Sequence, residues 1–199
     1  MGGKKIGAVV LAAGRSRRMG RPKLILPWGE RTVIETVVET LRAAGAAEII
    51  VVTGGARGEI EAALTEANAR TVYNPDFAVS EMLASLQVGA RALGEEIDAL
   101  LVALGDQPAV PVEAARAVVE AYEAGRARLV IPSYQMRRGH PWLVDRALWA
   151  SLLAMTSEQT MRDFLNGHPE EIQYVTVDHP GVLKDVDTPE DYEQLRPGK

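Results

Sequence analysis

The stretch that decides the fold lies near the N-terminus and reads Ile6-Gly-Ala-Val-Val-Leu-Ala-Ala-Gly-Arg-Ser-Arg-Arg-Met-Gly-Arg-Pro-Lys23. Its first six residues are aliphatic or small and predict a buried β-strand over residues 6–11. The small residues Ala12, Ala13 and Gly14 then let the backbone turn sharply and approach a ligand closely. Because this strand end leads into a loop rich in basic residues, we expect the loop to bind a polyphosphate.

The charge of this loop contrasts with that of the remaining chain. Among 199 residues, 22 are basic and 27 acidic, yet no acidic residue precedes Glu30 and seven basic residues do. Residues 30–199 therefore carry 15 basic and 27 acidic side chains, a net charge of −12. A basic loop on an acidic body favours a small anionic ligand and argues against nucleic acid, which would require a broad basic face.

Five cations crowd the loop, namely Arg15, Arg17, Arg18, Arg21 and Lys23. A solvated surface loop is the alternative interpretation, but five like charges within nine residues repel one another unless an anion lies among them. Arg18 offers a planar fork and Lys23 a point charge, which suit different phosphate oxygens. We expect Arg17 and Arg21 to face solvent.

Length and composition indicate one domain. We expect it to span residues 1–195, with a flexible tail at 196–199, because 199 residues with 47% hydrophobic content suffice for one substantial core. The chain has no cysteine and three histidines, so any metal is expected to be a hard cation bound by oxygen. It has neither a long apolar run nor a signal-peptide pattern, which predicts a cytoplasmic protein without a membrane partner.

Apolar runs alternate with helical patterns along the chain. Strands are predicted at residues 6–11, 49–53, 99–104, 129–131 and 172–177, with a short further one at 71–73. Helices are predicted at residues 32–44, 58–67, 80–93, 112–124, 146–154, 160–165 and 189–195. This alternation predicts an α/β fold with a mainly parallel sheet, helices on both faces, and a ligand site at the carboxyl ends of the strands.

The loop after the third predicted strand carries a candidate metal ligand. It reads Leu104-Gly-Asp-Gln-Pro108, in which Gly105 permits an unusual backbone angle and Pro108 ends the strand. Asp106 is then exposed at the strand's carboxyl end, where it suits Mg²⁺, an ion that takes one or two protein carboxylates plus phosphate oxygens. The alternative is that Asp106 caps the helix that begins near Pro111.

A second acidic segment lies near the C-terminus, at residues 184–191. Alternation along an extended chain places Asp185 and Asp187 on the same side, ahead of Thr188 as a helix N-cap and Pro189 at the first helical position. Asp191 is expected to be structural, since acids near a helix start favour the helix dipole. Asp187 suits a metal ion better than a capping role, because capping alone does not explain two aspartates.

A third segment, Arg138-Gly-His-Pro-Trp142, follows the strand that ends at Pro132. His140 could contact an acceptor substrate or serve only as a turn residue, and the sequence leaves both interpretations open. Trp142 is expected to pack in the core.

Four segments taken together resemble the MobA-like nucleotidyltransferases. They are residues 11–28, Gly105-Asp-Gln-Pro108, Arg138-Gly-His-Pro141 and Asp185-Val-Asp-Thr-Pro-Glu-Asp191, in the family's order over almost the whole chain. Ala12-Ala13, the continuation Lys23-Leu-Ile-Leu-Pro-Trp28 and the Gly-His-Pro segment favour the molybdenum cofactor cytidylyltransferase branch.

The resemblance implies a single Rossmann-like nucleotidyltransferase domain that transfers CMP from CTP to the terminal phosphate of molybdopterin, with Mg²⁺ bound and pyrophosphate released. It implies roles for Arg18, Lys23 and Asp106 in catalysis, and for Asp106 and Asp187 in metal binding. His140 would contact the acceptor, and a downstream molybdoenzyme would be a partner. Nucleotide contacts would come from Leu11, Ala12, Ala13, Gly14, Arg15, Arg18, Lys23, Met82 and Ser85.

Trp142 and Thr160-Met-Arg162 depart from the family pattern in the half that faces the acceptor, which leaves the acceptor open. The alternatives are a cytidylyl- or guanylyltransferase for another phosphorylated acceptor, such as a sugar or alcohol phosphate, or a non-catalytic carrier of the molybdenum cofactor. A dinucleotide-binding oxidoreductase is disfavoured because the chain has no Gly-x-Gly-x-x-Gly motif.

Overall fold

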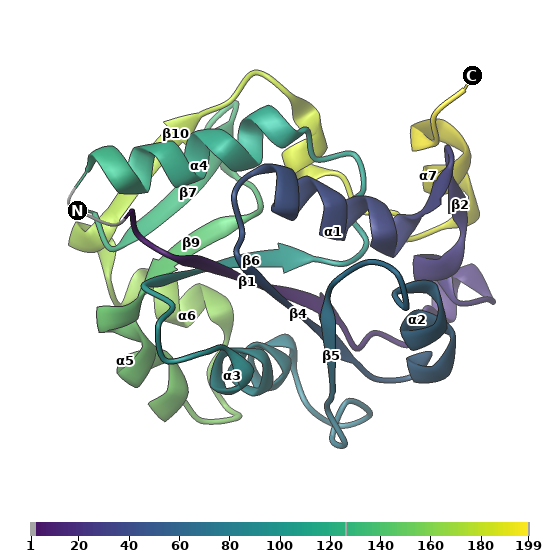
Figure 1. Cartoon of the computed structure of the whole chain (residues 1–199), viewed down its shortest axis with the longest axis horizontal. Coiled ribbons are helices and arrows are strands. Elements are labelled where there is room, and N and C mark those ends of the chain that lie inside the picture. The colour runs from purple at the N-terminus through teal and green to yellow at the C-terminus, as the bar shows by residue number, and fades with distance from the viewer. Residues whose placement is uncertain (1–2, 126, 199) are drawn as a thin grey trace.

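An eight-stranded sheet forms the centre of the computed structural model, which describes residues 3–125 and 127–198 (Figure 1). The strands lie in the order β10-β7-β9-β6-β1-β4-β5, and β8 pairs with β7. Their bounds are β1 Ile6–Ala12, β4 Glu48–Thr53, β5 Arg70–Tyr73, β6 Ala99–Leu104, β7 Leu129–Tyr134, β8 Arg137–Arg138, β9 Trp142–Asp145 and β10 Ile172–Thr176. A separate antiparallel pair consists of β2 Pro27–Trp28 and β3 Arg31–Thr32.

The central strand is β1, which pairs in parallel with β4 on one side and β6 on the other. All seven of its residues are buried, as a strand covered on both faces requires. Its register places Leu11 beside Leu104 and Ala12 beside Thr53, so the three strands end at the same edge. The prediction of a mainly parallel sheet with its loops at one edge is confirmed.

Strand β9 was not predicted, and it runs antiparallel between β6 and β7. Its apolar core is only Trp142, Leu143 and Val144, a run too short to be recognised from periodicity. Residues 142–145 adopt an extended conformation because β6 and β7 supply hydrogen-bond partners on both sides. Antiparallel pairing therefore interrupts the sheet where the sequence predicted a parallel arrangement.

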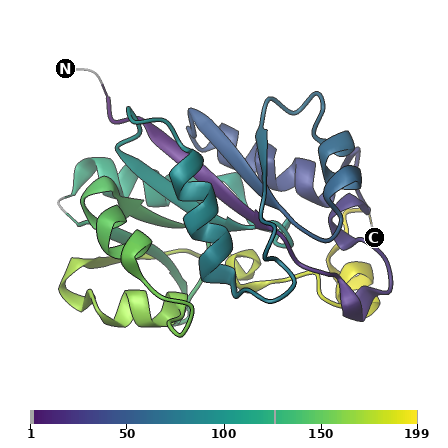
Figure 2. The same cartoon turned by 90° about the horizontal axis from the view of Figure 1, so that it is seen from below.

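Helices cover both faces of the sheet (Figures 1 and 2). Apolar side chains of α1, α2, α4 and α7 belong to the core on one face, and those of α3, α5 and α6 to the core on the other. The helix bounds are α1 Val33–Ala43, α2 Arg57–Ala63, α3 Met82–Ala92, α4 Val112–Ala124, α5 Trp149–Ala154, α6 Met161–Asn166 and α7 Pro189–Leu195. All seven predicted helices are present, with α2 ending four residues earlier than expected and a 3₁₀ turn, Arg146–Leu148, preceding α5.

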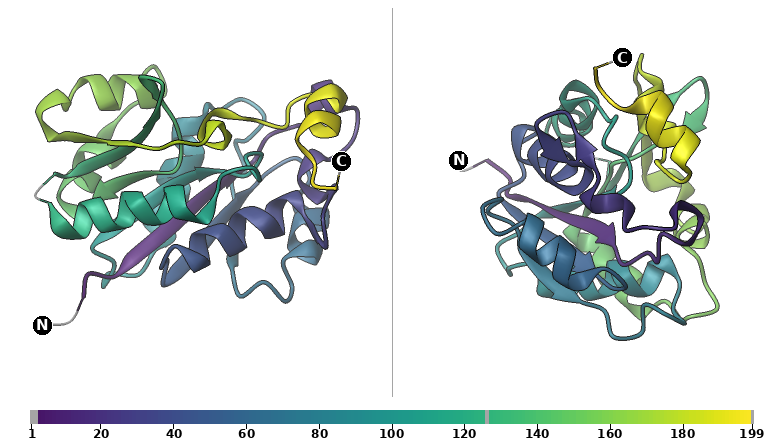
Figure 3. Two further views of the ribbon diagram at one scale, coloured as in Figure 1. Left: turned by 90° about the horizontal axis from the view of Figure 1, so that it is seen from above. Right: turned by 90° about the vertical axis from the view of Figure 1, so that its right-hand side faces the viewer.

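The C-terminal helix returns to the beginning of the chain. In both views of Figure 3, α7 lies beside the segment that follows β1. The Tyr192 hydroxyl donates to the Pro27 carbonyl at 2.6 Å, and the Tyr192 and Trp28 rings lie 6.2 Å apart. This packing brings the acidic segment before α7 next to the basic loop after β1. Within the described residues, every helix is too short or too polar to cross a membrane.

The predicted tail begins directly after α7, at Arg196, and Lys199 lies outside the described residues. Arg196 remains tied to the helix, because its backbone N–H donates to the Tyr192 carbonyl at 3.0 Å.

Candidate active site

A pocket of about 500 Å³ opens at the edge where β1 and β6 end. The loop after β1, the start of α3, and the carboxylates of Asp106, Asp185 and Asp187 line it. With the exception of His140, the predicted site residues all line this pocket, namely Leu11, Ala12, Ala13, Gly14, Arg15, Arg18, Lys23, Met82, Ser85, Asp106 and Asp187.

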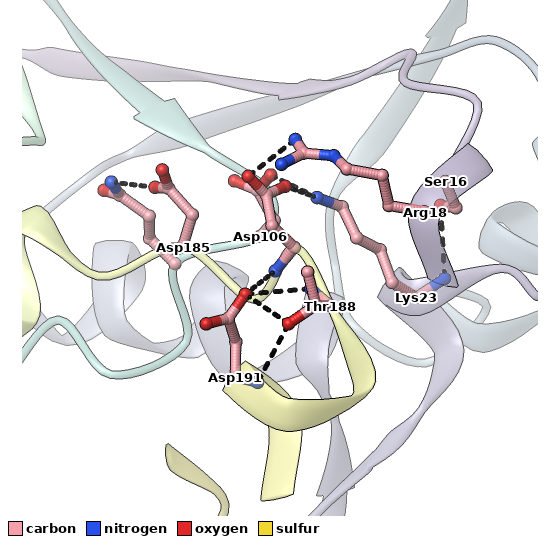
Figure 4. A network of polar contacts seen from close by, with 9 residues as sticks. Ser16, Arg18, Lys23, Asp106, Asp185, Thr188 and Asp191 are labelled. Atoms are coloured by element: carbon pink, nitrogen blue, oxygen red, sulfur yellow. Dashed lines mark hydrogen bonds and ion pairs between the residues drawn. The ribbon is translucent and has the colours of Figure 1, made fainter. Parts of the chain in front are cut away.

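Four charged side chains meet on one side of the pocket (Figure 4). The Lys23 ammonium donates to Asp106 Oδ2 at 2.6 Å and to Asp187 Oδ1 at 2.8 Å. Arg18 Nη2 donates to the other oxygen of Asp187 at 2.7 Å. The basic loop and the two distant aspartates therefore converge.

The acidic segment is fixed by its backbone and by the helix that follows it. The Val186 N–H donates to the Asp106 carbonyl at 2.8 Å, and the Val186 side chain is fully buried. The neighbouring Asp185 and Asp187 consequently face the pocket, as alternation along an extended chain predicted.

Helix α7 is capped as the sequence predicted, whereas α4 is not capped by Asp106. The Thr188 hydroxyl caps α7 in a capping box with Asp191, so Asp191 has the structural role expected of it. Helix α4 begins after Pro111 without a side-chain cap. The alternative that Asp106 caps α4 is therefore wrong.

Position 105 requires glycine because a side chain would not fit there, and not because the backbone angle is unusual. Its φ is not positive, which corrects the sequence interpretation. Its N–H donates to the Leu11 carbonyl at 3.0 Å, and a Cβ at this position would lie 3.0 Å from the same oxygen and 3.2 Å from the Ile34 side chain. The absence of a side chain therefore lets the turn that carries Asp106 approach the end of β1.

The electrostatic environment favours the charged forms of Lys23 and Asp187. Burial by itself would lower the pKa of Lys23, whose side chain is only 12% exposed, but Asp106 and Asp187 outweigh this effect and raise the pKa. Burial would raise the pKa of Asp187, but hydrogen bonds and charge interactions with Lys23 and Arg18 outweigh it and lower the pKa.

Asp106 and Asp187 fit a magnesium ion. The Lys23 ammonium binds both carboxylates, which shows that their oxygens can share one cation. Among the described residues, no group of three or more His, Cys, Asp or Glu side chains is arranged to hold a metal. Two carboxylates suffice for Mg²⁺, because this ion draws its other ligands from substrate phosphates and water.

The basic loop has a distinctive backbone. Ser16 adopts a left-handed conformation with φ of 48°, which costs energy for a residue with a side chain, and such strain is often found at functional sites. Its hydroxyl accepts a hydrogen bond from the Lys23 N–H at 3.3 Å, which closes the loop. Arg21 is exposed, as predicted, and the side chain of Arg17 lies outside the described set.

A second loop, residues 74–81, also borders the pocket. Asn74 is 2% exposed and organises this loop, because its amide donates to Ser80 Oγ at 3.2 Å and Ser85 Oγ at 3.0 Å. Arg15 Nη2 donates to the Ala78 carbonyl at 2.7 Å and so ties the basic loop to this second loop. The polar network of Asn74 was not visible in the sequence, because it depends on how the loop folds back onto α3.

His140 does not line the large pocket. Its ring stacks on Trp142 with centroids 5.2 Å apart, and its side chain faces a separate small cavity under α1. Burial lowers the pKa of His140 to about 4, so the ring is neutral at neutral pH. Trp142 is 5% exposed and packs in the core, as predicted.

Gln107 is a site residue that sequence reasoning missed. Its amide Nε2 donates to Asp185 Oδ1 at 2.6 Å, while the Gln107 side chain is buried. Its position directly after Asp106 was the only sequence signal that could have indicated a role beside the carboxylates of the pocket.

The fold and the site define an α/β protein in which a pocket lined by basic and acidic side chains opens where the parallel strands end. The profile of the MobA-like NTP transferase domain matches residues 8–173, and the chain belongs to this family. It is a nucleotidyltransferase, as its structural neighbours also indicate.

Two characterised relatives match over most of their length. The nicotine blue oxidoreductase of Paenarthrobacter nicotinovorans is 30% identical over 194 residues, covering 94% of each chain. The molybdenum cofactor cytidylyltransferase of Escherichia coli K12 is 26% identical over 189 residues, covering 94% of this chain and 93% of the relative.

Solved structures show the same fold. Rv0371c of Mycobacterium tuberculosis H37Rv superposes with a TM-score of 0.84 at 28% identity over the whole of both chains. Its complex with manganese gives a TM-score of 0.80 at 27% identity, covering 98% of this chain and 100% of the other. A nucleotidyl transferase of Methanothermobacter gives 0.82 at 31% identity, covering 98% and 97%.

Proposed function

We propose that this protein transfers CMP from CTP to the terminal phosphate of molybdopterin or the molybdenum cofactor and releases pyrophosphate. The observation that carries the proposal is the convergence of Lys23, Asp106 and Asp187 within hydrogen-bond distance at the pocket edge. The full-length similarity to a cytidylyltransferase that acts on the molybdenum cofactor supports the choice of nucleotide and acceptor.

The pocket suits a nucleoside triphosphate. The backbone of Leu11 to Gly14 would surround the nucleotide, and a Cβ at Gly14 would meet no atom within 4 Å, so the ligand can approach the chain there. Met82 and Ser85 also line the pocket and would contact the base and ribose. Lys23, Arg15 and Arg18 would neutralise phosphate oxygens.

The reaction needs alignment and charge neutralisation more than proton removal. An acceptor phosphate is already ionised at neutral pH, so its oxygen attacks the α-phosphorus as the bond to the bridging oxygen of pyrophosphate breaks. Asp106 and Asp187 would hold Mg²⁺, which supplies positive charge to the phosphates when bound. Lys23 and Arg18 stabilise the negative charge that develops on the transferring and leaving groups.

Substitution of Asp106 tests the proposed nucleotidyl transfer. Asp106→Asn keeps the size of the side chain and removes its charge, so we expect turnover with CTP, Mg²⁺ and molybdopterin to fall by about 10²-fold or more, the scale of one well-placed electrostatic group. Pyrophosphate release measures turnover, and Asp178→Asn, at an exposed position away from the pocket, is the matched control. Near-normal release by folded Asp106→Asn protein would remove Asp106 from the mechanism.

Substrate choice requires its own measurement. Competition among the four nucleoside triphosphates for transfer to labelled acceptor identifies the base, and sugar or alcohol phosphates in place of molybdopterin test the acceptor. We expect CTP and molybdopterin to be preferred. A protein that binds molybdopterin but releases no pyrophosphate with any triphosphate would be a carrier.

The similarity to nicotine blue oxidoreductase favours a redox reaction as the second candidate function. Reduction of nicotine blue with NADH or NADPH, followed by absorbance, tests it directly. Dye reduction well above the rate without protein, together with no pyrophosphate release, would favour the redox function over nucleotidyl transfer.

A further inference from the structure

Two buried polar atoms near the pocket lack a hydrogen-bond partner among the described residues. Gln107 Oε1 and His140 Nε2 are both inaccessible to solvent, and neither accepts or donates a hydrogen bond within the part of the chain that the structure describes. A buried polar atom left unpaired destabilises the fold, because it has lost its hydrogen bonds to water. Two such atoms therefore point to a molecule that binds them.

Both side chains line the same small cavity. It lies between α1 and the end of β6. The volume that the centre of a water molecule can occupy in it is about 10 Å³. That is close to the smallest space in which one water molecule fits, and too little for any larger ligand. Thr40 of α1 also lines the cavity and contributes a third polar side chain.

The orientation of Gln107 follows from its contact on the other side. Nε2 donates to Asp185 Oδ1 at 2.6 Å, and a carboxylate accepts hydrogen bonds. The amide nitrogen must therefore face Asp185. Because the two ends of a side-chain amide point apart, Oε1 faces away from Asp185 and requires a donor of its own.

Water satisfies both atoms whichever nitrogen of His140 carries the proton. One water hydrogen can bond to Gln107 Oε1, which only accepts. The same water can accept from His140 Nε2 if this nitrogen is protonated, or donate its second hydrogen if it is not.

Asp185 needs such support because of its neighbours. It lies in the same pocket as Asp106 and Asp187, whose negative charges repel it. Gln107 offers the counteracting contact, a hydrogen bond to one oxygen of Asp185. The other oxygen is then available to accept hydrogen bonds from the waters that Mg²⁺ retains.

We infer that one buried water joins His140 Nε2 to Gln107 Oε1, and that both side chains are positioning residues that hold Asp185 at the metal site. His140 thereby acts on the active site through Gln107 rather than by touching the nucleotide. The effect on metal binding rests on the proposed function, whereas the water bridge does not.

A crystal structure of the protein without ligands, at a resolution that shows ordered water, tests the bridge. We expect a water within about 3 Å of both Gln107 Oε1 and His140 Nε2. A cavity without density, or a direct contact between the two side chains, would overturn the inference.

Manganese binding, measured by electron paramagnetic resonance without nucleotide, tests the positioning. Gln107→Leu should weaken Mn²⁺ binding by about tenfold, the lower end for loss of a group that orients a metal ligand. His140→Leu should weaken it less, and His140→Gln, which can place an N–H near the original Nε2, should restore it.

A variant with both substitutions distinguishes an effect that passes from His140 through Gln107 to Asp185 from general destabilisation of the protein. Because His140 acts through Gln107, Gln107→Leu with His140→Leu should bind Mn²⁺ no more weakly than Gln107→Leu alone. Additive losses would show that His140 acts independently and would overturn the inference. If the protein releases no pyrophosphate but retains this pattern and the bridging water, only the proposed function fails.

Discussion

At the scale of single residues, Lys23 occupies the position between two carboxylates that a metal ion would take. Its ammonium lies 2.6 Å from Asp106 and 2.8 Å from Asp187 and is largely buried. A divalent ion must compete with this ammonium for the same oxygens. Once displaced, the ammonium becomes available to the phosphates, which favours binding of metal and nucleotide together.

Replacing Lys23 with methionine tests this competition. Lys23→Met should bind Mn²⁺ about tenfold more tightly than the native protein without nucleotide, because no ammonium competes for the carboxylates. It should bind CTP more weakly, because one phosphate contact is lost. Isothermal titration with each ligand alone measures both effects.

Arg21→Met is the matched control, since it removes the same charge from the same loop at an exposed position. Equal changes in Mn²⁺ affinity for the two variants would mean that overall charge, rather than occupancy of the metal position, sets the affinity.

At the scale of secondary-structure elements, the sequence predicted those features that depend on local chemistry. The N-cap of α7 could be recognised because Thr188 and Pro189 occupy characteristic positions at a helix start. The common orientation of Asp185 and Asp187 followed from the period of an extended chain.

Features that depend on distant partners could not be predicted in this way. Strand β9 forms only because β6 and β7 flank it, and the role of Gln107 depends on a carboxylate 78 residues away. Nor could the sequence show that His140 lies under α1, since a short Gly-His-Pro segment does not reveal which cavity its ring will face.

Two capping boxes allow an element-scale prediction. Thr188 caps α7 and Thr160 caps α6, and each hydroxyl accepts from its aspartate N–H at 3.2 Å. Thr188→Ala and Thr160→Ala should each lower the free energy of unfolding by about 1 kcal/mol, as measured with urea. Only Thr188→Ala should also lower pyrophosphate release, by about tenfold, because Asp187 directly precedes this cap.

Equal activity of the two variants at equal stability would show that the start of α7 does not position Asp187. A loss of activity in Thr160→Ala as well would point to general destabilisation.

At the scale of the whole molecule, the site is assembled from parts that are remote in the sequence. Asp106 follows the strand beside β1, and α7 packs against the β2 region, so the charged cluster requires both the parallel sheet and the returning C-terminal helix. The charge contrast between the first 29 residues and the remaining chain becomes, in three dimensions, a contact between a basic loop and acidic turns.

Burial of His140 makes the stability of the whole fold depend on pH. Its pKa is about 4 in the folded protein and about 6.5 in an unfolded chain, so the unfolded state binds more protons between these values. The stabilisation is therefore fully present above pH 6.5 and is lost as the pH falls towards 4, by up to about 3 kcal/mol. Urea unfolding at several pH values should show this loss in the native protein and a shallower one in His140→Gln, which does not titrate. Parallel pH dependences in the two proteins would mean that the His140 ring is hydrated enough to take up a proton in the folded state.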